Sequence, residues 1–367
     1  MRLSFLVSTL ILVLAAPLTA VAQMRVAPED AAERIDAAFA DYTARAIETL
    51  ASSDSPRDRW TAAWMLLGEV ARASADAPRA AVLRKRADGL FASALKDGSA
   101  DPLVLSWALL DPPVDAGADA RNTATARLVI LDRMRKIEPE NAMVWVAAMP
   151  GFGQPGTVPE GMRLLAKAAA AKRFDTHFGD SLRELIGAFD RVPPPKVWPE
   201  TKGLKGWDGL RAEDVPAVMA VGIANAVAMP YLAEVNTWCQ DARVHPWLED
   251  CRKLAKLMTQ HSDTLVVKSL GINLLSKLAD PGEAEAKRLA KLRRNLAWVA
   301  EMGMQQVGPG QPISYHDWHK AWSAKGATEE SVGRALLKLQ KLPVTPPASY
   351  VPAWDRNAPE QAPPAQE

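Results

Sequence analysis

The sequence has 367 residues, of which 48% are hydrophobic, and its 44 basic and 43 acidic side chains give a formal net charge of +1. So balanced a charge argues against a nucleic-acid partner, which needs a concentrated basic surface, and against electrostatic docking on a membrane. The chain is long enough to bury a substantial core, and a length above about 250 residues favours two domains or a repeat array.

Residues 1–22 have the pattern of a secretory signal peptide. Arg2 gives a positive start, residues 5–16 are almost wholly apolar, Pro17 ends the run, and Ala20-Val21-Ala22 offers a cleavage site. The apolar run is shorter than the roughly 20 residues of a membrane span. We therefore expect cleavage after Ala22, which removes one positive charge (+1 − 1 = 0). We expect no stable membrane insertion of the mature chain.

The expected destination depends on the residue after the cleavage site and on composition. That residue is Gln23 rather than cysteine, so we expect a soluble product and no acylated lipoprotein. Alanine and arginine are abundant, which is typical of bacterial proteins. The sequence therefore predicts the bacterial periplasm as the destination, with full secretion as the alternative.

Helical periodicity runs through nearly the whole chain after the signal segment. Within residues 28–50, apolar side chains recur at three- and four-residue steps. The pattern continues in residues 60–71 and 79–95, on either side of a turn at 74–78. We find no convincing run of alternating apolar and polar β-branched residues of the kind that indicates strands. The sequence therefore predicts an all-α fold.

Three tryptophans follow turn-forming residues in a similar way. Pro56 precedes Trp64, Asp101-Pro102 precedes Trp107, and Pro139 precedes Trp145. Such a turn before an apolar, tryptophan-bearing helix is typical of the point where one helical pair is followed by the next.

One part of this pattern resembles the tetratricopeptide (TPR) repeat, which has the form W-x2-L-G-x2-Y, then A-x3-F, then P. The resemblance implies helical hairpins stacked as an irregular α-solenoid, in which the glycine lets the next helix pack close to the first. The segments that carry it are Trp64-x2-Leu67-Gly68, Ala87-x3-Phe91 and Pro102, with the first-helix core repeated at Val218-x2-Val221-Gly222 and Val267-x2-Leu270-Gly271.

The chain also departs from the TPR pattern. The tyrosine position holds Ala71, and the spacings between Trp64, Trp107 and Trp145 are 43 and 38 residues. The family's repeat is about 34 residues long. The prediction is thus a degenerate TPR-like protein of bacterial, exported type, and the alternative is an all-α domain without true repeats.

A change of composition divides the chain into two expected helical halves. Three consecutive prolines, 193–195, cannot continue a helix, and glycines follow them. From Pro343 the chain is rich in Pro, Ala and Gln, so we expect disorder, with 350–354 as the one segment of the tail able to dock. The expected parts are an N-terminal helical-repeat domain at 23–190, a linker at 191–209, a C-terminal helical domain at 210–342 and a tail at 343–367.

The loop Gly151-Phe152-Gly153-Gln154-Pro155-Gly156 matches the letters of the dinucleotide motif G-x-G-x-x-G. A dinucleotide site needs this loop to follow a strand, whereas here it follows a helix. We therefore expect no cofactor. The residues after the loop, Thr157 to Glu160, have the spacing of a helix capping box.

The two cysteines, Cys239 and Cys251, lie on the apolar faces of two predicted helices that are separated by a turn at Pro246. In an oxidising compartment this arrangement predicts a disulfide. The spacing matches no zinc pattern, and no activating cluster lies beside either thiol.

Two histidines near the C-terminus are the candidate metal ligands. His316 and His319 are three residues apart on a predicted helix that starts at a capping box, Ser314 to Asp317. A zinc hydrolase would show H-E-x-x-H, which is absent, and Trp318 and Trp322 mark the helix as a packing element. The default expectation is therefore no metal site, with these two residues as the alternative.

No catalytic motif is found, so an enzyme is the less favoured class. The first hypothesis is an exported helical-repeat scaffold that binds a protein or peptide in a concave groove. A helical enzyme that cleaves a wall glycan or peptide in a cleft near Trp198 and Trp207 is the second, and a structural protein without a ligand is the third. The candidate groove residues are Trp64, Trp107, Trp145, Trp198 and Trp207.

Overall fold

A computed structural model describes residues 29–73, 76–110, 120–152, 156–201, 209–227, 232–240, 242–278, 282–304, 307–308 and 311–356. The expected signal peptide at 1–22 lies outside these ranges, as does Trp207. Within the described residues the structure contains helices, three isolated β-bridges and no strand. The predicted all-α class is confirmed. None of the described helices is long and apolar enough to cross a membrane.

The chain forms two compact units, each discontinuous in sequence. Unit 1 consists of the described residues within Met1–Pro139, His177–Pro230 and Val307–Gly326. Its helices are α2 (Glu29–Ala51), α3 (Pro56–Arg72), α4 (Ala77–Asp97), α5 (Pro102–Leu110), α6 (Ala120–Ile137), α9 (Phe178–Asp190), η1 (Ala212–Asp214), α10 (Val215–Val227) and α15 (Tyr315–Trp322).

Unit 2 consists of the described residues within Glu140–Thr176, Tyr231–Gln306 and Ala327–Glu367. Its helices are α7 (Ala142–Val146), α8 (Val158–Ala169), α11 (Leu232–Gln240), η2 (Ala242–Val244), α12 (Leu248–His261), α13 (Leu265–Leu278), α14 (Glu283–Trp298), the π-helical η3 (Val299–Met304), α16 (Glu329–Leu339) and α17 (Ala353–Arg356).

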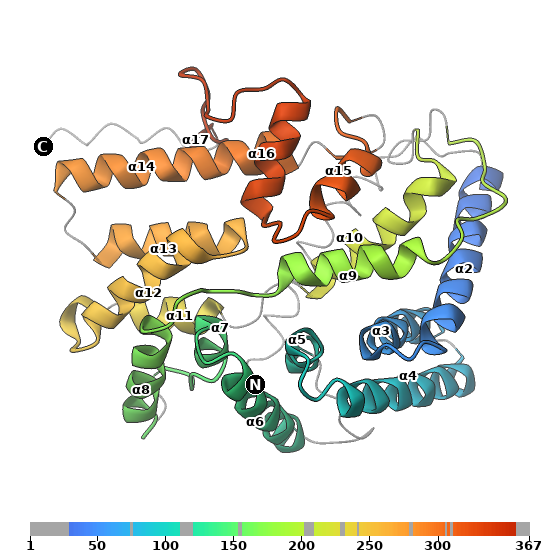
Figure 1. The fold of residues 1–367 in the computed structure, drawn as a ribbon, viewed down its shortest axis with the longest axis horizontal. Coiled ribbons are helices and arrows are strands. Elements are labelled where there is room, and N and C mark those ends of the chain that lie inside the picture. Colours follow the sequence, from blue (N-terminus) through green and yellow to red (C-terminus); the bar gives the residue numbers. More distant parts are fainter. Residues whose placement is uncertain are drawn as a thin grey trace, which may run out of the picture. The chain divides into compact units, whose positions relative to one another are not determined.

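Aromatic side chains fill the core of unit 1 between α3, α4 and α5, and Figure 1 shows α3 and α4 side by side. The Trp60 ring lies 4.7 Å from Phe91, and the Trp64 ring lies 5.1 Å from Trp107. The Trp107 indole N–H donates to Ser181 Oγ of α9 at 2.9 Å. A buried indole N–H usually finds an acceptor, and here the bond joins α5 to α9.

The proline-rich segment is part of unit 1 rather than a boundary between the units. Arg45 of α2 donates to the Pro193 carbonyl at 2.6 Å. Trp198 packs edge-on against Phe39 of α2, and its N–H donates to the Leu210 carbonyl at 2.9 Å. The expected division at 191–209 therefore does not separate the two units, because the segment packs back onto α2.

Unit 2 is centred on the helical hairpin of α12 and α13 (Figure 1). Cys239 at the end of α11 and Cys251 in α12 form a disulfide, and both side chains are fully buried. The predicted pairing is confirmed. The bond closes a turn in which the Trp247 indole donates to the Trp238 carbonyl at 3.0 Å.

The start of the tail is ordered as far as residue 356, which corrects the expectation of disorder from residue 343. Trp298 of α14 donates to the Pro343 carbonyl at 2.8 Å, and its ring lies 4.9 Å from that of Tyr350. The Arg294 side chain donates to the Tyr350 carbonyl, and Glu301 accepts the Ala353 N–H. Side chains of α14 and η3 thus supply the hydrogen bonds that the proline-rich segment cannot make internally.

The glycines of the TPR-like motif have different surroundings. A methyl group at Gly271 would lie 2.6 Å from Thr259 Oγ1 and 2.7 Å from the Ala255 carbonyl of α12, so this glycine permits close helix packing. A methyl group at Gly68 or Gly222 would meet nothing within 4 Å. The expected role of the glycine therefore holds at one position and is wrong at the other two.

The expected capping box at the start of α8 is also corrected. The Thr157 side chain makes no cap hydrogen bond and instead donates to the Gly151 carbonyl at 3.5 Å.

We expect loss of the disulfide to lower the free energy of unfolding by about 3 kcal/mol, because the crosslink restricts the unfolded chain. Urea unfolding with and without reductant measures this, and the Cys239→Ala/Cys251→Ala variant should be insensitive to reductant. Two reactive thiols in the denatured, non-reduced protein would contradict the pairing.

We expect Gly271→Ala to destabilise the protein by about 1–3 kcal/mol, since the added methyl overlaps α12. Gly68→Ala should stabilise it by up to about 1 kcal/mol, because alanine is the better helix former and meets no neighbour. Thermal or urea unfolding of the two variants gives the comparison. Equal changes in the free energy of unfolding for the two variants would contradict the closer packing at Gly271.

Candidate functional site

Helix α15 carries the candidate metal ligands and packs on α9 and α10 of unit 1. Its start is fixed by Ser314, whose hydroxyl accepts the Asp317 N–H at 3.1 Å and donates to the Asp317 carboxylate at 2.7 Å. Ser314 is therefore the N-cap, but the Asp317 carboxylate bonds to the Ser314 hydroxyl, so only this half of the predicted capping box is present. His319 lies against α9, where its Nε2 is 2.7 Å from the Asp190 carboxylate, whereas the His316 side chain is exposed.

A cavity of about 540 Å³ lies beside the start of α15, and residues of η1 line it together with Gly308, Gln311 and Ser314. A second hollow of about 190 Å³ shares five of its lining residues and continues to Asp190 and His319. We call the two hollows together the α15 cavity. The residues shared by both are Arg211, Glu213, Asp214, Tyr315 and His316.

Charged groups on and before η1 form one wall of the α15 cavity. The Arg211 guanidinium lies 2.5 Å from a Glu213 oxygen and 3.3 Å from Asp214. Asp214 also accepts the Arg211 backbone N–H at 3.0 Å, so its buried carboxylate fixes the start of η1. Hydrogen bonding to Asp214 raises the pKa of Arg211. The guanidinium is thus occupied by two carboxylates.

The cavity does not provide a preformed metal site. Among the described residues, no three of its acids and histidines bring their ligand atoms within 4.8 Å of one another. His316 and His319 therefore remain unassigned as metal ligands.

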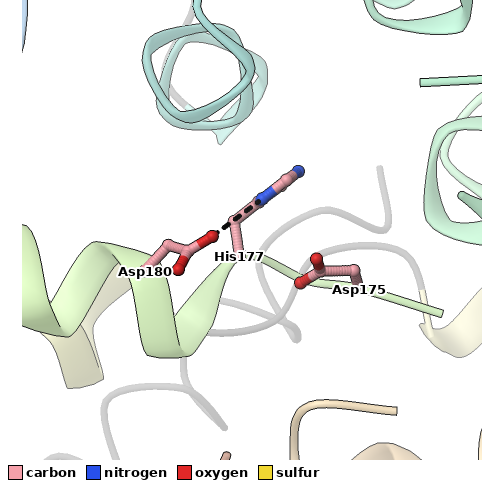
Figure 2. A group of neighbouring side chains, drawn as sticks. All are labelled: Asp175, His177 and Asp180. Carbon is pink, nitrogen blue, oxygen red and sulfur yellow. Dashed lines mark ion pairs between the residues drawn. The ribbon is translucent and has the colours of Figure 1, made fainter. Parts of the chain in front are cut away.

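A different group of acids and a histidine lies near the start of α9. Figure 2 shows His177 and Asp180 of unit 1, where Nδ1 and a carboxylate oxygen are 3.9 Å apart. Asp175, two residues earlier in the chain, belongs to unit 2. The other ring nitrogen of His177 is 2.7 Å from the buried Glu138 carboxylate. Only two of the three side chains in Figure 2 belong to one unit, so we assign no metal to them.

A second concave surface lies on α2, α3 and α4 of unit 1. It is a groove of about 250 Å³ that we call the α2–α4 groove. Its floor is apolar, since Ile47 and Leu66 are buried there, and its rim is charged. The lining residues are Ala40, Ala44, Ile47, Glu48, Leu66, Glu69, Arg79, Leu83 and Arg86.

One rim of the groove is fixed by an ion pair between helices. Arg86 of α4 donates to both carboxylate oxygens of Glu48 of α2, at 2.6 and 2.7 Å. This bidentate hydrogen bonding lowers the pKa of Glu48 and raises that of Arg86. Since planar bidentate pairs fix orientation as well as charge, the rim has a defined geometry.

The candidate groove tryptophans that the structure describes differ in their surroundings. Trp107 is 1% exposed and lies in the core, so its side chain does not line a groove. Trp64 is half-buried against Trp107 and Trp60. Trp198 packs on Phe39, and Trp145 belongs to unit 2. Trp207 lies outside the described residues.

Sequence reasoning missed both concave surfaces. The residues Ala40 and Ala44 lie on the helical face of α2 at a spacing of four, which indicates a helix but gives no sign that the opposing helix leaves a hollow. Arg211, Glu213 and Asp214 form a charged cluster directly before a helix, and this was the one available signal. Nothing in the sequence relates them to His316, which lies far along the chain.

Glu329 is the described carboxyl group that most resembles a catalytic acid. Burial, and then the nearby charge of Asp263, raise its pKa from 4.5 to about 7. Its carboxylate accepts the Leu265 N–H at 2.6 Å, at the start of α13. Glu329 lines neither the α15 cavity nor the α2–α4 groove, and its hydrogen bond indicates a structural role.

Comparisons with protein-family models, curated proteins and solved structures give no match for this chain.

We expect Glu329→Gln to change the pH dependence of stability. Because the pKa of Glu329 is raised in the folded state, its protonated carboxyl group makes its full contribution to stability below pH 4.5. This contribution is lost as the pH rises towards 7. Glutamine still accepts the Leu265 N–H and stays neutral, so the variant should gain up to about 3 kcal/mol over the wild type at pH 8. Urea unfolding from pH 5 to pH 8 measures the difference. The exposed control Glu285→Gln should behave like the wild type, and a parallel pH profile for Glu329→Gln would refute the assignment.

Proposed function

We propose that this protein is an exported helical scaffold that binds a protein or peptide partner in the bacterial cell envelope. The observation that carries the proposal is the α2–α4 groove, which has an apolar floor and a charged rim.

The size of the groove favours a side chain of a macromolecular partner over a small metabolite. Small-molecule sites are usually about 300–1,000 Å³, and the groove has about 250 Å³. A hollow of this size accommodates one or two apolar side chains. Grooves between helices bind amphipathic segments in this way, with apolar anchors at helical spacing.

The rim of the groove indicates the chemistry of the partner. Arg79 and Arg86 lie on α4, while Glu48 and Glu69 lie on α2 and α3. Both signs of charge are therefore present around the apolar floor. The expected partner segment has an apolar anchor, which enters between Ala44 and Leu83, and flanking side chains of both charges.

The compartment is supported by the disulfide together with the leader-like sequence. A disulfide persists in oxidising compartments such as the periplasm, and Cys239 and Cys251 are paired. The periplasm is thus the proposed location, and full secretion remains the alternative.

The alternative function, a wall-cleaving enzyme, has no specific observation in its favour. Trp198, expected beside its cleft, hydrogen-bonds the Leu210 carbonyl and packs on α2. Glu329, whose pKa is raised, is hydrogen-bonded to a helix start.

Placing a charge in the groove tests the proposal. Ala44 is an exposed residue of α2 that lines the groove, and Ala92 is an exposed residue of α4 that does not. Both tolerate glutamate in a helix. Used as bait in an extract of the envelope of its source organism, the wild-type protein and Ala92→Glu should retain the same partner. Ala44→Glu should retain at least about tenfold less, which corresponds to about 1.4 kcal/mol of lost binding.

Equal retention by both variants would exclude this groove as the binding site. Release of soluble wall fragments by the wild-type protein, with no partner retained, would instead support the enzyme.

A further inference from the structure

We propose that the α15 cavity binds a small organic cation, that is, a ligand with an ammonium or guanidinium group. This site is separate from the α2–α4 groove and does not depend on the function proposed for the groove.

The cavity has the size that a small ligand needs. Its main hollow is about 540 Å³, within the range of about 300–1,000 Å³ that is usual for small-molecule sites. Described residues from three parts of unit 1 line it: residues between Gly209 and Asp214, then Gly308 and Gln311, and then Ser314 to Asp317. Residues far apart in sequence therefore line one hollow.

The charge of the walls selects a cation. The main hollow is lined by the carboxylates of Glu213, Asp214 and Asp317 and by the single guanidinium of Arg211, so its formal charge is 1 − 3 = −2 with the histidine neutral. The guanidinium is already paired with two of these carboxylates, Glu213 and Asp214. The second hollow adds the carboxylate of Asp190.

The negative field extends to the hydroxyl group of Tyr315. The pKa of this hydroxyl is raised, first by burial and second by the charge of Asp214. A field that opposes ionisation of Tyr315 favours a positive ligand in the space beside it.

Neutral polar groups in the walls are free to orient such a ligand. No hydrogen bond among the described residues uses the Tyr315 hydroxyl, the His316 ring or the Gln311 side chain, and all three line the main hollow. Each can accept a hydrogen bond from an ammonium or guanidinium group.

An organic cation fits these walls better than a metal ion. A metal needs several ligand atoms close together, and the acids and histidines of the cavity do not bring three within 4.8 Å in the described structure. A cation with its charge on an extended carbon chain can contact carboxylates that lie further apart.

Isothermal titration of the purified full chain with four probes tests the proposal. Cadaverine and a blocked Gly-Lys-Gly peptide are the cations, and diacetylcadaverine and the acetyl-lysine form of the peptide are their neutral counterparts. We expect at least one cation to bind roughly tenfold or more tightly than its neutral counterpart. Tighter binding of cadaverine would indicate a free amine as the ligand, and tighter binding of the peptide would indicate a lysine side chain.

Variants locate the binding in the α15 cavity. Glu213 and Glu160 are both exposed and both paired with an arginine, but only Glu213 lines the cavity. Glu213→Gln and Tyr315→Phe should weaken cation binding by severalfold, and Glu160→Gln should not. Thermal unfolding checks that each variant is folded. The proposal is refuted if neither cation binds more tightly than its neutral form, or if Glu213→Gln and Tyr315→Phe both bind like the wild type.

Discussion

The structure depends on large tryptophan rings, and five described tryptophans also donate their indole N–H to an acceptor. Leaving a buried donor without an acceptor costs about 1–3 kcal/mol. Among the described tryptophans, Trp198, Trp238, Trp247 and Trp298 each donate to a backbone carbonyl outside a regular α-helix or at its end, and Trp107 donates to Ser181. These bonds attach the loop at residue 150 and the tail to helices, and they join Trp198 of the proline-rich segment to Leu210. The Nε1 atoms of Trp60 and Trp322 are buried without a partner in the described structure, so burial alone holds those two rings.

Tight packing around the tryptophans explains where the open surfaces of unit 1 lie. The aromatic core occupies the contact between α3, α4 and α5. The groove beside it is lined on α2 partly by the short side chains of Ala40 and Ala44. Beside α15 the hollow has a different lining. The buried Asp214 holds Arg211 against η1, so charged groups line the space instead of filling it. One surface is therefore lined mainly by apolar groups, and the other mainly by polar groups.

Local sequence patterns predicted the features that depend on residues close together in the chain. The helical periodicity gave the all-α class, the two cysteines on facing apolar stripes gave the disulfide, and Ser314 gave a helix cap. Thr157 has the same spacing to a glutamate, yet its hydroxyl bonds to Gly151, because the preceding loop brings an acceptor close. The three prolines correctly excluded a helix, but they did not show that Arg45 and Phe39 would hold the segment against α2.

Features that depend on tertiary contacts were not predictable from one sequence. The motif glycines Gly68 and Gly271 have similar sequence surroundings, and only Gly271 has a helix packed against it. The α15 cavity joins Arg211 to His316, and the α2–α4 groove joins Ala44 to Leu83. The separation of the two residues in the sequence does not indicate, for either pair, that they line the same hollow. The expected groove of tryptophans was built on residue type alone, and Trp107 proved to be a core residue.

The central claim is that the α2–α4 groove binds a polypeptide partner, and site-specific photocrosslinking tests it most directly. A photoreactive amino acid would replace Ala44 in the groove or Ala92 outside it, and the protein would be irradiated in cells of its source organism. The account predicts one discrete crosslinked protein from position 44 and none from position 92. The absence of any crosslink from position 44, or the same crosslinked species from both positions, would contradict it.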